Sequence, residues 1–460
     1  MLLTLRRFFA LAGFALLAAS CSDGTTIEPR TIPAERSLDD QVRASISGWG
    51  VVPILPVNAQ NPALVDLGRS LFFDKILSGN RDVSCATCHS PLANSGDGQS
   101  LAIGTGAVLA GGTRRLGAGR QFTPRNAPAL FNSALGMFYI FWDGRLSEEF
   151  GPGRFRTPSD ITLPSGLSGL LAAQAMIPVT NRVEMRGDAG DRDVLGNPNE
   201  LAQIADGQSS AIWDAAMRRV LAINAYQQKF NAAFPGVPAS QLGFQHAANA
   251  IAAFETQTFT KSNSPFDRYL ARDNNALSID AKHGALLFFG KARCSSCHNG
   301  ALLGAQGFAN AGVPQIGPGT GSAAPLDAGR DDQFSGVKPA SLQFLFRVPP
   351  LRNVELSAPY MHNGVYATLE AVVRHYNNAD SALKSFDASE LDPALRASYH
   401  ADAATKVRAT LDGRLQQPMG LTDDEQKQLV AFLKSLTDPS ARDLSSVAPA
   451  SVPSGLPIRD

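Results

Sequence analysis

This chain has few cysteines, few histidines and no net charge. Five of its 460 residues are cysteine, seven are histidine, and lysine plus arginine balance aspartate plus glutamate at 41 each. A neutral chain with a sequence pI near 7.1 lacks the basic surface that nucleic acid requires, so we expect no nucleic-acid partner. No apolar run after residue 19 is long enough to span a membrane. The length and the 44% hydrophobic content favour a packed globular protein of about two or three domains.

The N-terminus is typical of an export signal. A short basic start at residues 6–7 precedes an apolar stretch at residues 8–19 that is too short to favour spanning a bilayer. Residues 17–21 resemble a lipoprotein cleavage box, and cleavage there would leave Cys21 as a lipidated first residue. An ordinary signal cleaved nearby would discard Cys21 instead. We therefore expect a signal peptide at residues 1–21 and a periplasmic protein, either soluble or tethered to the membrane as a lipoprotein.

The other four cysteines form two Cys-x-x-Cys pairs, each followed directly by histidine. The two motifs are Cys85-Ala86-Thr87-Cys88-His89 and Cys294-Ser295-Ser296-Cys297-His298. Two thiols one helical turn apart can add to the two vinyl groups of a haem, and the adjacent histidine then reaches the iron. A redox dithiol would follow a strand in a βαβ unit, and a zinc site would need more cysteine or histidine nearby. The spacing therefore predicts two covalent haem c groups, with His89 and His298 as proximal ligands.

Both motifs lie in an internal repeat. Gly68-Arg69-Ser70-Leu71-Phe72-Phe73 precedes the first motif, and Gly284-Ala285-Leu286-Leu287-Phe288-Phe289 precedes the second. The repeat predicts a mainly α fold with two cytochrome c-like haem domains, extended loops and a tail. The expected boundaries are a linker at 22–45, the first haem domain with a long insertion at 46–270, the second haem domain at 271–440, and an extended tail at 441–460.

Apolar spacing and capping signals predict several helices. The spacing favours helices within residues 210–234 and 239–259. Thr422 and Glu425 form a capping box at the start of a further amphipathic helix. Residues 306–345 are rich in glycine and proline and favour a loop.

Four further stretches resemble the bacterial di-haem cytochrome c peroxidase family, including its MauG-like branch. These stretches are residues 126–132, 141–145, 264–270 and 351–362, and the resemblance runs from about residue 60 to residue 436. It implies an enzyme that reduces hydrogen peroxide at the first haem. The implied electron donor is a small cytochrome, a cupredoxin, or an aromatic residue on a partner protein. The alternative is a di-haem electron carrier without peroxidase activity, in which neither iron has an open face.

The resemblance also implies a catalytic set. Gln174 and Glu184, ten residues apart, match the pair that flanks the peroxide site in the family, and Pro178 matches a proline of the distal pocket. Glu184 would move a proton between the two peroxide oxygens, and Gln174 would hold peroxide or water by hydrogen bonding. Trp142 would lie between the haems and shorten the electron path. The alternatives are an ordinary surface glutamate at 184 and a core tryptophan at 142.

The chain departs from the usual peroxidase pattern at both irons. The loop at residues 90–120 contains no histidine, and glycine and threonine stand at 104–105, near the place of the usual distal histidine. We therefore expect a first haem that is five-coordinate or water-bound without reductive activation. Tyr376 stands where a methionine usually faces the second iron, as in MauG-like enzymes; His375 and Met361 are the alternatives. A phenolate favours oxidised iron, so the two haems could share the oxidising equivalents.

Two further features follow from the resemblance. Family members bind calcium between the domains through an asparagine side chain and two backbone carbonyls, and the matching positions are Asn126, Ser357 and Pro359. Carbonyl ligands tolerate a change of side chain, so serine in place of the usual threonine has little effect. An insertion at residues 146–172 lengthens the segment between Trp142 and Gln174 and could reshape the surface above the first haem.

Overall fold

The computed structural model describes residues 36–148, 151–158, 161–304, 306–333 and 340–459. The chain divides into a short unit, Met1–Ser37, and a large compact unit, Leu38–Asp460. The expected signal at residues 1–21, including Cys21, lies outside the described residues. Within the described ranges no helix is both long and apolar enough to cross a membrane.

The large unit is built mainly from helices joined by long loops, which confirms the expected helix-rich class. The helices are α1 Leu38–Ile46, α2 Pro62–Phe73, α3 Cys85–Cys88, α4 Leu170–Ala175, α5 Glu200–Gln203, α6 Ser209–Leu221, α7 Asn224–Ala233, α8 Phe244–Phe259, α9 Pro265–Leu270, α10 Ile279–Phe289, α11 Leu369–Asn377, α12 Ala379–Lys384, α13 Ala404–Ala409 and α14 Asp423–Lys434. The strands are β1 Val108–Ala110, β2 Thr113–Arg115, β3 Tyr139–Ile140, β4 Leu146–Ser147, β5 Phe308–Ala309 and β6 Phe346–Arg347. They form three antiparallel pairs, β1 with β2, β3 with β4, and β5 with β6.

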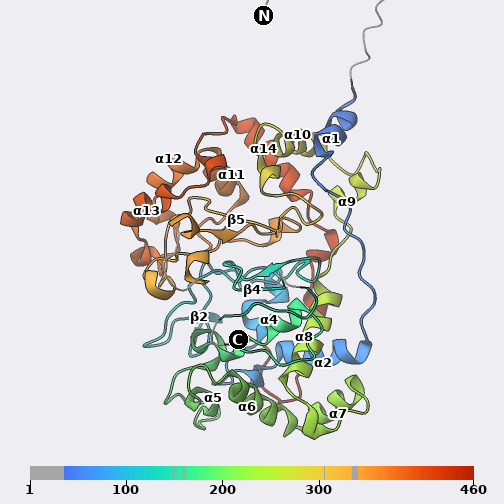
Figure 1. Cartoon of the computed structure of the whole chain (residues 1–460), viewed down its shortest axis with the longest axis vertical. Helices are drawn as coiled ribbons and strands as arrows, with labels where there is room; N and C mark the ends of the chain where they lie inside the picture. Colours follow the sequence, from blue (N-terminus) through green and yellow to red (C-terminus); the bar gives the residue numbers. More distant parts are fainter. Residues whose placement is uncertain (1–35, 149–150, 159–160, 305, 334–339, 460) are drawn as a thin grey trace, which may run out of the picture. The chain divides into compact units, whose positions relative to one another are not determined.

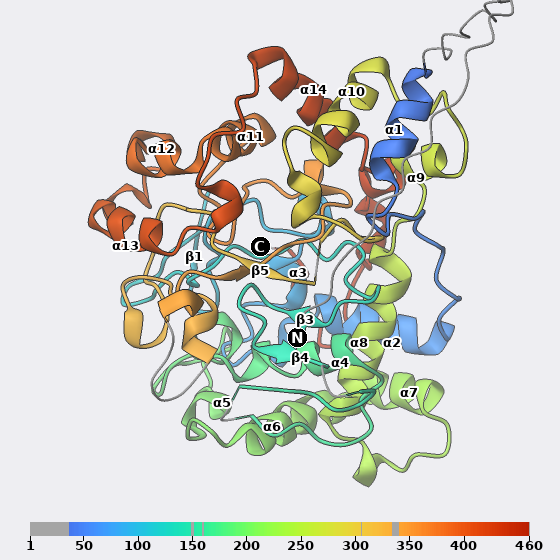
Figure 2. The ribbon, with the colours of Figure 1, turned by 45° about the horizontal axis from the view of Figure 1, so that its top comes forward.

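Two groups of helices flank these short strands and their loops (Figures 1 and 2). One group contains α2, α4 and α6–α8, and the other contains α10, α11 and α14 with α1 and α9. Each group has its own apolar core. The first core includes Leu71, Phe72 and Phe254, and the second includes Phe288 and Phe432.

Helix α2, which precedes the first Cys-x-x-Cys-His motif, crosses α8 at a glycine. A Cβ added at Gly68 would lie 1.9 Å from the carbonyl oxygen of Ala250 and 2.9 Å from the Cβ of Phe254. Only glycine therefore allows the two backbones to approach this closely. The rings of Phe72 and Phe254 meet beside the crossing, with centroids 5.1 Å apart.

Helix α10, which precedes the second motif, crosses α14 in the same manner. A Cβ at Gly284 would lie 2.0 Å from the carbonyl oxygen of Gln428 and 2.8 Å from the Cβ of Phe432. Thr422 caps α14 and forms the expected capping box with Glu425. The predicted start of this helix is therefore confirmed.

Helix α1 corrects the expected linker at residues 22–45 from Leu38 onward. Val42 and Ile46 are spaced by four residues, so both lie on one face of the helix. They are 0% and 7% exposed and belong to the second core. The last part of the expected linker is thus a helix docked against α10.

Two other segments differ in position from the sequence-based map. Phe266 and Tyr269 of α9 are buried in the second core, although residue 270 was the expected end of the first domain. The part of the expected tail that the structure describes, residues 441–459, returns to the first core, where Val452 is 5% exposed. The tail is therefore an integral part of the packing around α2 and α8.

Candidate functional site

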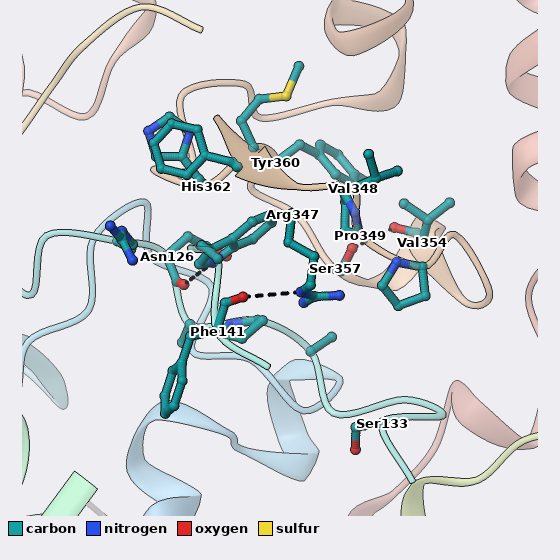
Figure 3. A pocket seen from close by; sticks show the side chains of 18 of the residues that line it. Asn126, Ser133, Phe141, Arg347, Val348, Pro349, Val354, Ser357, Tyr360 and His362 are labelled. Atoms are coloured by element: carbon teal, nitrogen blue, oxygen red, sulfur yellow. Dashed lines mark hydrogen bonds between the residues drawn. The ribbon is translucent and has the colours of Figure 1, made fainter. Parts of the chain in front are cut away.

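One cavity receives residues from both groups of helices. It is lined, among others, by the fourteen residues singled out in the sequence: Cys85, Cys88, His89, Asn126, Trp142, Gln174, Pro178, Glu184, Cys294, Cys297, His298, Ser357, Pro359 and Tyr376. The positions come from segments almost three hundred residues apart in the chain, and the fold gathers them around one space. Figure 3 shows part of its lining.

The first motif occupies the helical turn α3. Ser84 begins this turn, and its backbone N–H bonds to the Thr87 hydroxyl at 3.0 Å. Cys85 and Cys88 are free thiols one turn apart. Burial lowers the pKa of His89 to about 4, so its imidazole is neutral, and its Nδ1 lies 3.4 Å from the carbonyl oxygen of Ser95. The carbonyl can only accept, so Nδ1 carries the proton and Nε2 is left for a metal.

The second motif repeats this arrangement. The turn Cys294–Ser296 presents Cys294 and Cys297 as free thiols. The Nδ1 atom of His298 lies 3.1 Å from the carbonyl oxygen of Leu303, so this imidazole also keeps Nε2 available. Each motif thus brings two thiols and one suitably protonated histidine to an apolar cavity, which fits covalent haem attachment.

The distal candidates lie on three short consecutive elements. Gln174 is in α4, Pro178 starts the helical turn Pro178–Thr180, and Glu184 is in the π-helical turn Arg182–Arg186. The Asn181 side chain caps that turn by accepting the backbone N–H of Glu184 at 3.1 Å. Burial raises the pKa of Glu184, and the positive charge of Arg145 opposes this shift in part.

The loop that follows the first motif is fixed directly against the turn that carries Glu184. A Cβ at Gly104 would lie 2.0 Å from the carbonyl oxygen of Val183 and 2.9 Å from the Cα of Glu184. The neighbouring N–H of Thr105 donates to the carbonyl oxygen of Glu184 at 3.0 Å. A histidine cannot replace Gly104 without moving this backbone.

Trp142 is held by hydrogen bonds to two segments of the chain that line the cavity. Its indole Nε1–H donates to the carbonyl oxygen of Asn126 at 2.9 Å, and its own carbonyl oxygen accepts the N–H of Arg347 at 2.6 Å. The Arg347 Nε–H donates to the carbonyl oxygen of Phe141 at 3.1 Å (Figure 3). The indole is thus oriented by Asn126, while Arg347 holds the backbone of Trp142, and all three residues line the cavity.

The three candidate ligands of the second iron differ in their surroundings. Tyr376 lines the cavity, and burial raises the pKa of its phenol, so the proton stays unless a metal cation replaces it. Both ring nitrogens of His375 are engaged, Nδ1 with the Tyr366 hydroxyl and Nε2 with the carbonyl oxygen of Ala311, each at 2.8 Å. Met361 lines the cavity as well. The geometry therefore favours Tyr376 or Met361 over His375.

The expected calcium ligands are oxygen atoms at the cavity wall. Asn126 uses its backbone N–H and its side-chain NH₂ to donate to the carbonyl oxygens of His362 and Gln99, which leaves its side-chain oxygen as an acceptor. Neither the Ser357 nor the Pro359 carbonyl accepts a hydrogen bond from the described residues. An amide oxygen and two carbonyl oxygens suit a hard cation such as calcium.

Sequence reasoning missed a buried ion cluster beside this site. Arg125 Nη1 lies 2.5 Å from a carboxylate oxygen of Asp143, and its Nε and Nη2 lie 2.7 and 2.9 Å from the two oxygens of Asp327. All three side chains are at most 7% exposed. Asp143 lies in a stretch singled out in the sequence, but nothing local pointed to Asp327, which is far along the chain.

Sequence reasoning also missed Glu255 on α8. This carboxyl is 5% exposed and lines the cavity, and one of its oxygens has no hydrogen-bond partner among the described residues. Burial raises its pKa to about 8. A single glutamate in an apolar helix face was the only signal in the sequence.

Comparisons with known proteins identify the family of this chain. The model of the di-haem cytochrome c peroxidase family matches residues 62–275. The methylamine utilization protein MauG of Methylorubrum extorquens is 28% identical over 432 residues, 94% of this chain and 94% of that protein. The cytochrome c551 peroxidase of Pseudomonas aeruginosa is 32% identical over 316 residues, 68% of this chain and 71% of that protein.

A solved structure is similar to this chain in fold and in sequence. A MauG-like protein associated with microbial copper homeostasis has a TM-score of 0.58 and 26% identity over 87% of this chain and 97% of that chain. The sequence identity, the coverage and the fold all indicate the same family. The chain belongs to the di-haem cytochrome c peroxidase family, in its MauG-like branch, and is a peroxidase-type oxidoreductase.

Proposed function

We propose that this enzyme reduces hydrogen peroxide at a haem held by Cys85, Cys88 and His89. A second haem, held by Cys294, Cys297 and His298, would share the oxidising equivalents. One observation carries the proposal: the cavity that receives His89 also receives Gln174 and Glu184, and the loop that could carry a blocking histidine is pinned at Gly104.

The distal residues would divide the work of breaking peroxide between them. The bound haem iron supplies the centre at which the O–O bond is polarised and cleaved. Glu184, as a carboxylate, accepts the proton of the inner peroxide oxygen and delivers it to the outer oxygen, which leaves as water. The Gln174 amide donates a hydrogen bond that holds peroxide in place. Pro178 adds an apolar wall without a competing backbone N–H.

Electrons would reach the first site through Trp142. The indole N–H is held by the carbonyl oxygen of Asn126, and the backbone carbonyl of Trp142 is held by Arg347, which supports a fixed position for the ring. The electrons come from an external donor, which we take to be a small cytochrome, a cupredoxin or an aromatic residue on a partner protein.

The proposal is tested with holoprotein in the diferric state. Mixed in a stopped-flow instrument with one equivalent of hydrogen peroxide, it is expected to change its absorption spectrum rapidly, and cyanide is expected to bind at one haem. A reduced small cytochrome or cupredoxin should then restore the starting spectrum. If neither peroxide nor cyanide reacts at either haem, the chain is an electron carrier and the catalytic role is wrong.

Tyr376 is proposed as the distal ligand of the second iron. Tyr376→Phe and Tyr376→Met should change the low-spin ferric spectrum and raise the potential of the second haem by on the order of 100 mV or more, because the anionic ligand that favours oxidised iron is lost. Met361→Leu is the matched control and should leave both unchanged. A spectrum altered by Met361→Leu but not by the Tyr376 variants would assign the ligand to Met361.

A calcium ion is proposed at Asn126, Ser357 and Pro359. The free amide oxygen of Asn126 and the two carbonyls support it, since all three line the same cavity. The carbonyl oxygen of Asn126 also accepts the indole N–H of Trp142, so the ion would steady the tryptophan through this residue.

The internal repeat and the export of the chain are also proposed. Two cytochrome c-like domains are supported by the matching crossings at Gly68 and Gly284, each on the helix that leads to a motif. The basic and apolar start of the sequence supports export to the periplasm. Lipidation at Cys21 would add a membrane tether.

A further inference from the structure

An unbroken row of aromatic rings leads from the second motif's side of the cavity toward the surface. It runs from Tyr376 through His375, Tyr366 and Phe386 to Tyr399. Successive ring centroids are 5.5, 5.2, 6.0 and 5.3 Å apart, which is ordinary ring contact. The middle of the row is buried, with His375 and Tyr366 1% and 6% exposed. Tyr376, which lines the cavity, and Phe386 and Tyr399 at the other end of the row are each only partly buried.

Tyr366 has a proton acceptor already in place. The Nε2 atom of His375 lies 2.8 Å from the carbonyl oxygen of Ala311, which can only accept, so Nε2 carries the ring hydrogen. Nδ1 is then the acceptor, and the Tyr366 hydroxyl donates to it at 2.8 Å. A phenol that loses an electron becomes a strong acid. Its oxidation is therefore easiest where a base already holds the proton in a hydrogen bond.

We propose that this row carries oxidising equivalents from the second haem to Tyr399, where an electron donor that contacts the surface is oxidised. The inference rests on the proposed function, because hydrogen peroxide supplies the two oxidising equivalents. Tyr376 and His375 give ring contact from the cavity to Tyr366, and Phe386 gives ring contact from Tyr366 to Tyr399.

Each transfer along the row balances in electrons and protons. Tyr366 loses one electron toward the second haem and passes its phenolic proton to His375 Nδ1. One electron from Tyr399 then reduces Tyr366, and the proton returns from His375. Tyr399 releases its own proton to water when it is oxidised and regains one when the donor gives it an electron. Two such cycles supply the two electrons that, together with two protons taken up from solvent, reduce one hydrogen peroxide to two waters.

Another buried tyrosine provides the matched control. Tyr226 is 0% exposed and its hydroxyl donates to a carboxylate oxygen of Asp74 at 2.8 Å, so it too has a proton acceptor. It makes no aromatic ring contact with the residues that the structure describes. Like Tyr366, Tyr226 is hydrogen-bonded to a base of its own, but it is not part of the row of rings.

The experiment traps radicals in the diferric holoprotein after one equivalent of peroxide, with no donor present. Freeze-quench electron paramagnetic resonance should detect a tyrosyl radical, and peptide mapping with a phenolic radical probe should place the adduct at Tyr399. Tyr366→Phe and Phe386→Leu should each reduce this labelling roughly tenfold or more, since the first removes the oxidisable phenol and the second removes a ring from the row. The peroxide-induced spectrum should also persist longer in both variants.

Each outcome of this experiment supports or overturns the inference. In Tyr226→Phe the probe should label Tyr399 as strongly as it does in the parent. The proposed transfer along the row is wrong if labelling at Tyr399 is undiminished in both Tyr366→Phe and Phe386→Leu. It is also wrong if the label appears only at other positions. Either result leaves the peroxidase proposal intact. If the parent gives no peroxide-induced spectrum, the proposed function fails and the inference fails with it. Phe386→Leu keeps the test valid if Tyr366→Phe does not fold.

Discussion

A Glu184→Gln variant is expected to react with hydrogen peroxide about 100- to 10,000-fold more slowly than the parent, the range over which a positioned acid–base group usually contributes. Glutamine keeps the size and shape of the side chain but cannot accept the peroxide proton. Since the turn that carries Glu184 is held by Asn181 and by Thr105, the replacement should leave the backbone in place. The second-order rate constant of the absorption change in stopped-flow mixing measures the effect.

Two controls separate proton transfer from damage to the site. Glu425→Gln makes the same substitution at a helix cap on the protein surface, where the amide can still accept, and should react at the parental rate. Cyanide binding should be similar in Glu184→Gln and the parent, because an open iron needs no proton relay. Parental peroxide kinetics in Glu184→Gln would show that the acid–base role is wrong.

The pH dependence of the same reaction follows from the surroundings of Glu184. Burial raises its pKa, whereas Arg145 and Arg125 lower it, and the Cys88 thiol that also faces it becomes an uncharged thioether once haem is attached. The carboxylate form is the active base. The rate should therefore fall as pH drops through a pKa above the ordinary glutamate value of about 4.3. This acid limb should be absent in Glu184→Gln.

Some of this site could be predicted because its signals are local in the sequence. The Cys-x-x-Cys-His motifs and the Thr422 capping box each need only five residues or fewer to be recognised. The repeated glycines at 68 and 284 are visible in the sequence as a pattern. Their reason became visible only with the partner helices, since the atoms that exclude a Cβ belong to Ala250 and Gln428, far away in the chain.

Other features could not be predicted because they depend on distant partners. Helix α1 has only two buried apolar residues in a polar segment, and its burial depends on a surface that α10 provides. The row from Tyr376 to Tyr399 depends on how α11 packs against separate loops. The contact between Arg125 and Asp327 joins residues 202 positions apart.

Arg125→Met is expected to lower the free energy of unfolding by about 3–5 kcal/mol, the usual cost of removing one member of a buried ion pair. Arg125 is the cation that lies between the carboxylates of Asp143 and Asp327, which are 1% and 3% exposed. Asp143 keeps Arg145 at 3.2 Å, but Asp327 loses its only ion-pair partner among the described residues. Chemical denaturation of the holoprotein, followed by circular dichroism, measures the change.

The sign of the pH dependence distinguishes this explanation from simple loss of packing. Arg125 lowers the pKa of Asp327 to about 2, below its unfolded value of about 3.9. The ion pair therefore stabilises the parent above about pH 4, and that contribution fades as pH falls toward 2. The cost of Arg125→Met should shrink over the same range.

Two further variants isolate the unpaired charge itself. Adding Asp327→Asn to Arg125→Met should recover part of the loss, because a neutral amide replaces the carboxylate that was left without its cation. Lys427→Met breaks a pair whose side chains are 76% and 85% exposed and should leave the free energy of unfolding almost unchanged. If Arg125→Met lowers the free energy of unfolding no more than Lys427→Met does, the cluster of Arg125, Asp143 and Asp327 does not stabilise the fold. Asn126, which follows Arg125, accepts the indole N–H of Trp142. If the ion cluster is lost in Arg125→Met, the indole should therefore also become more mobile.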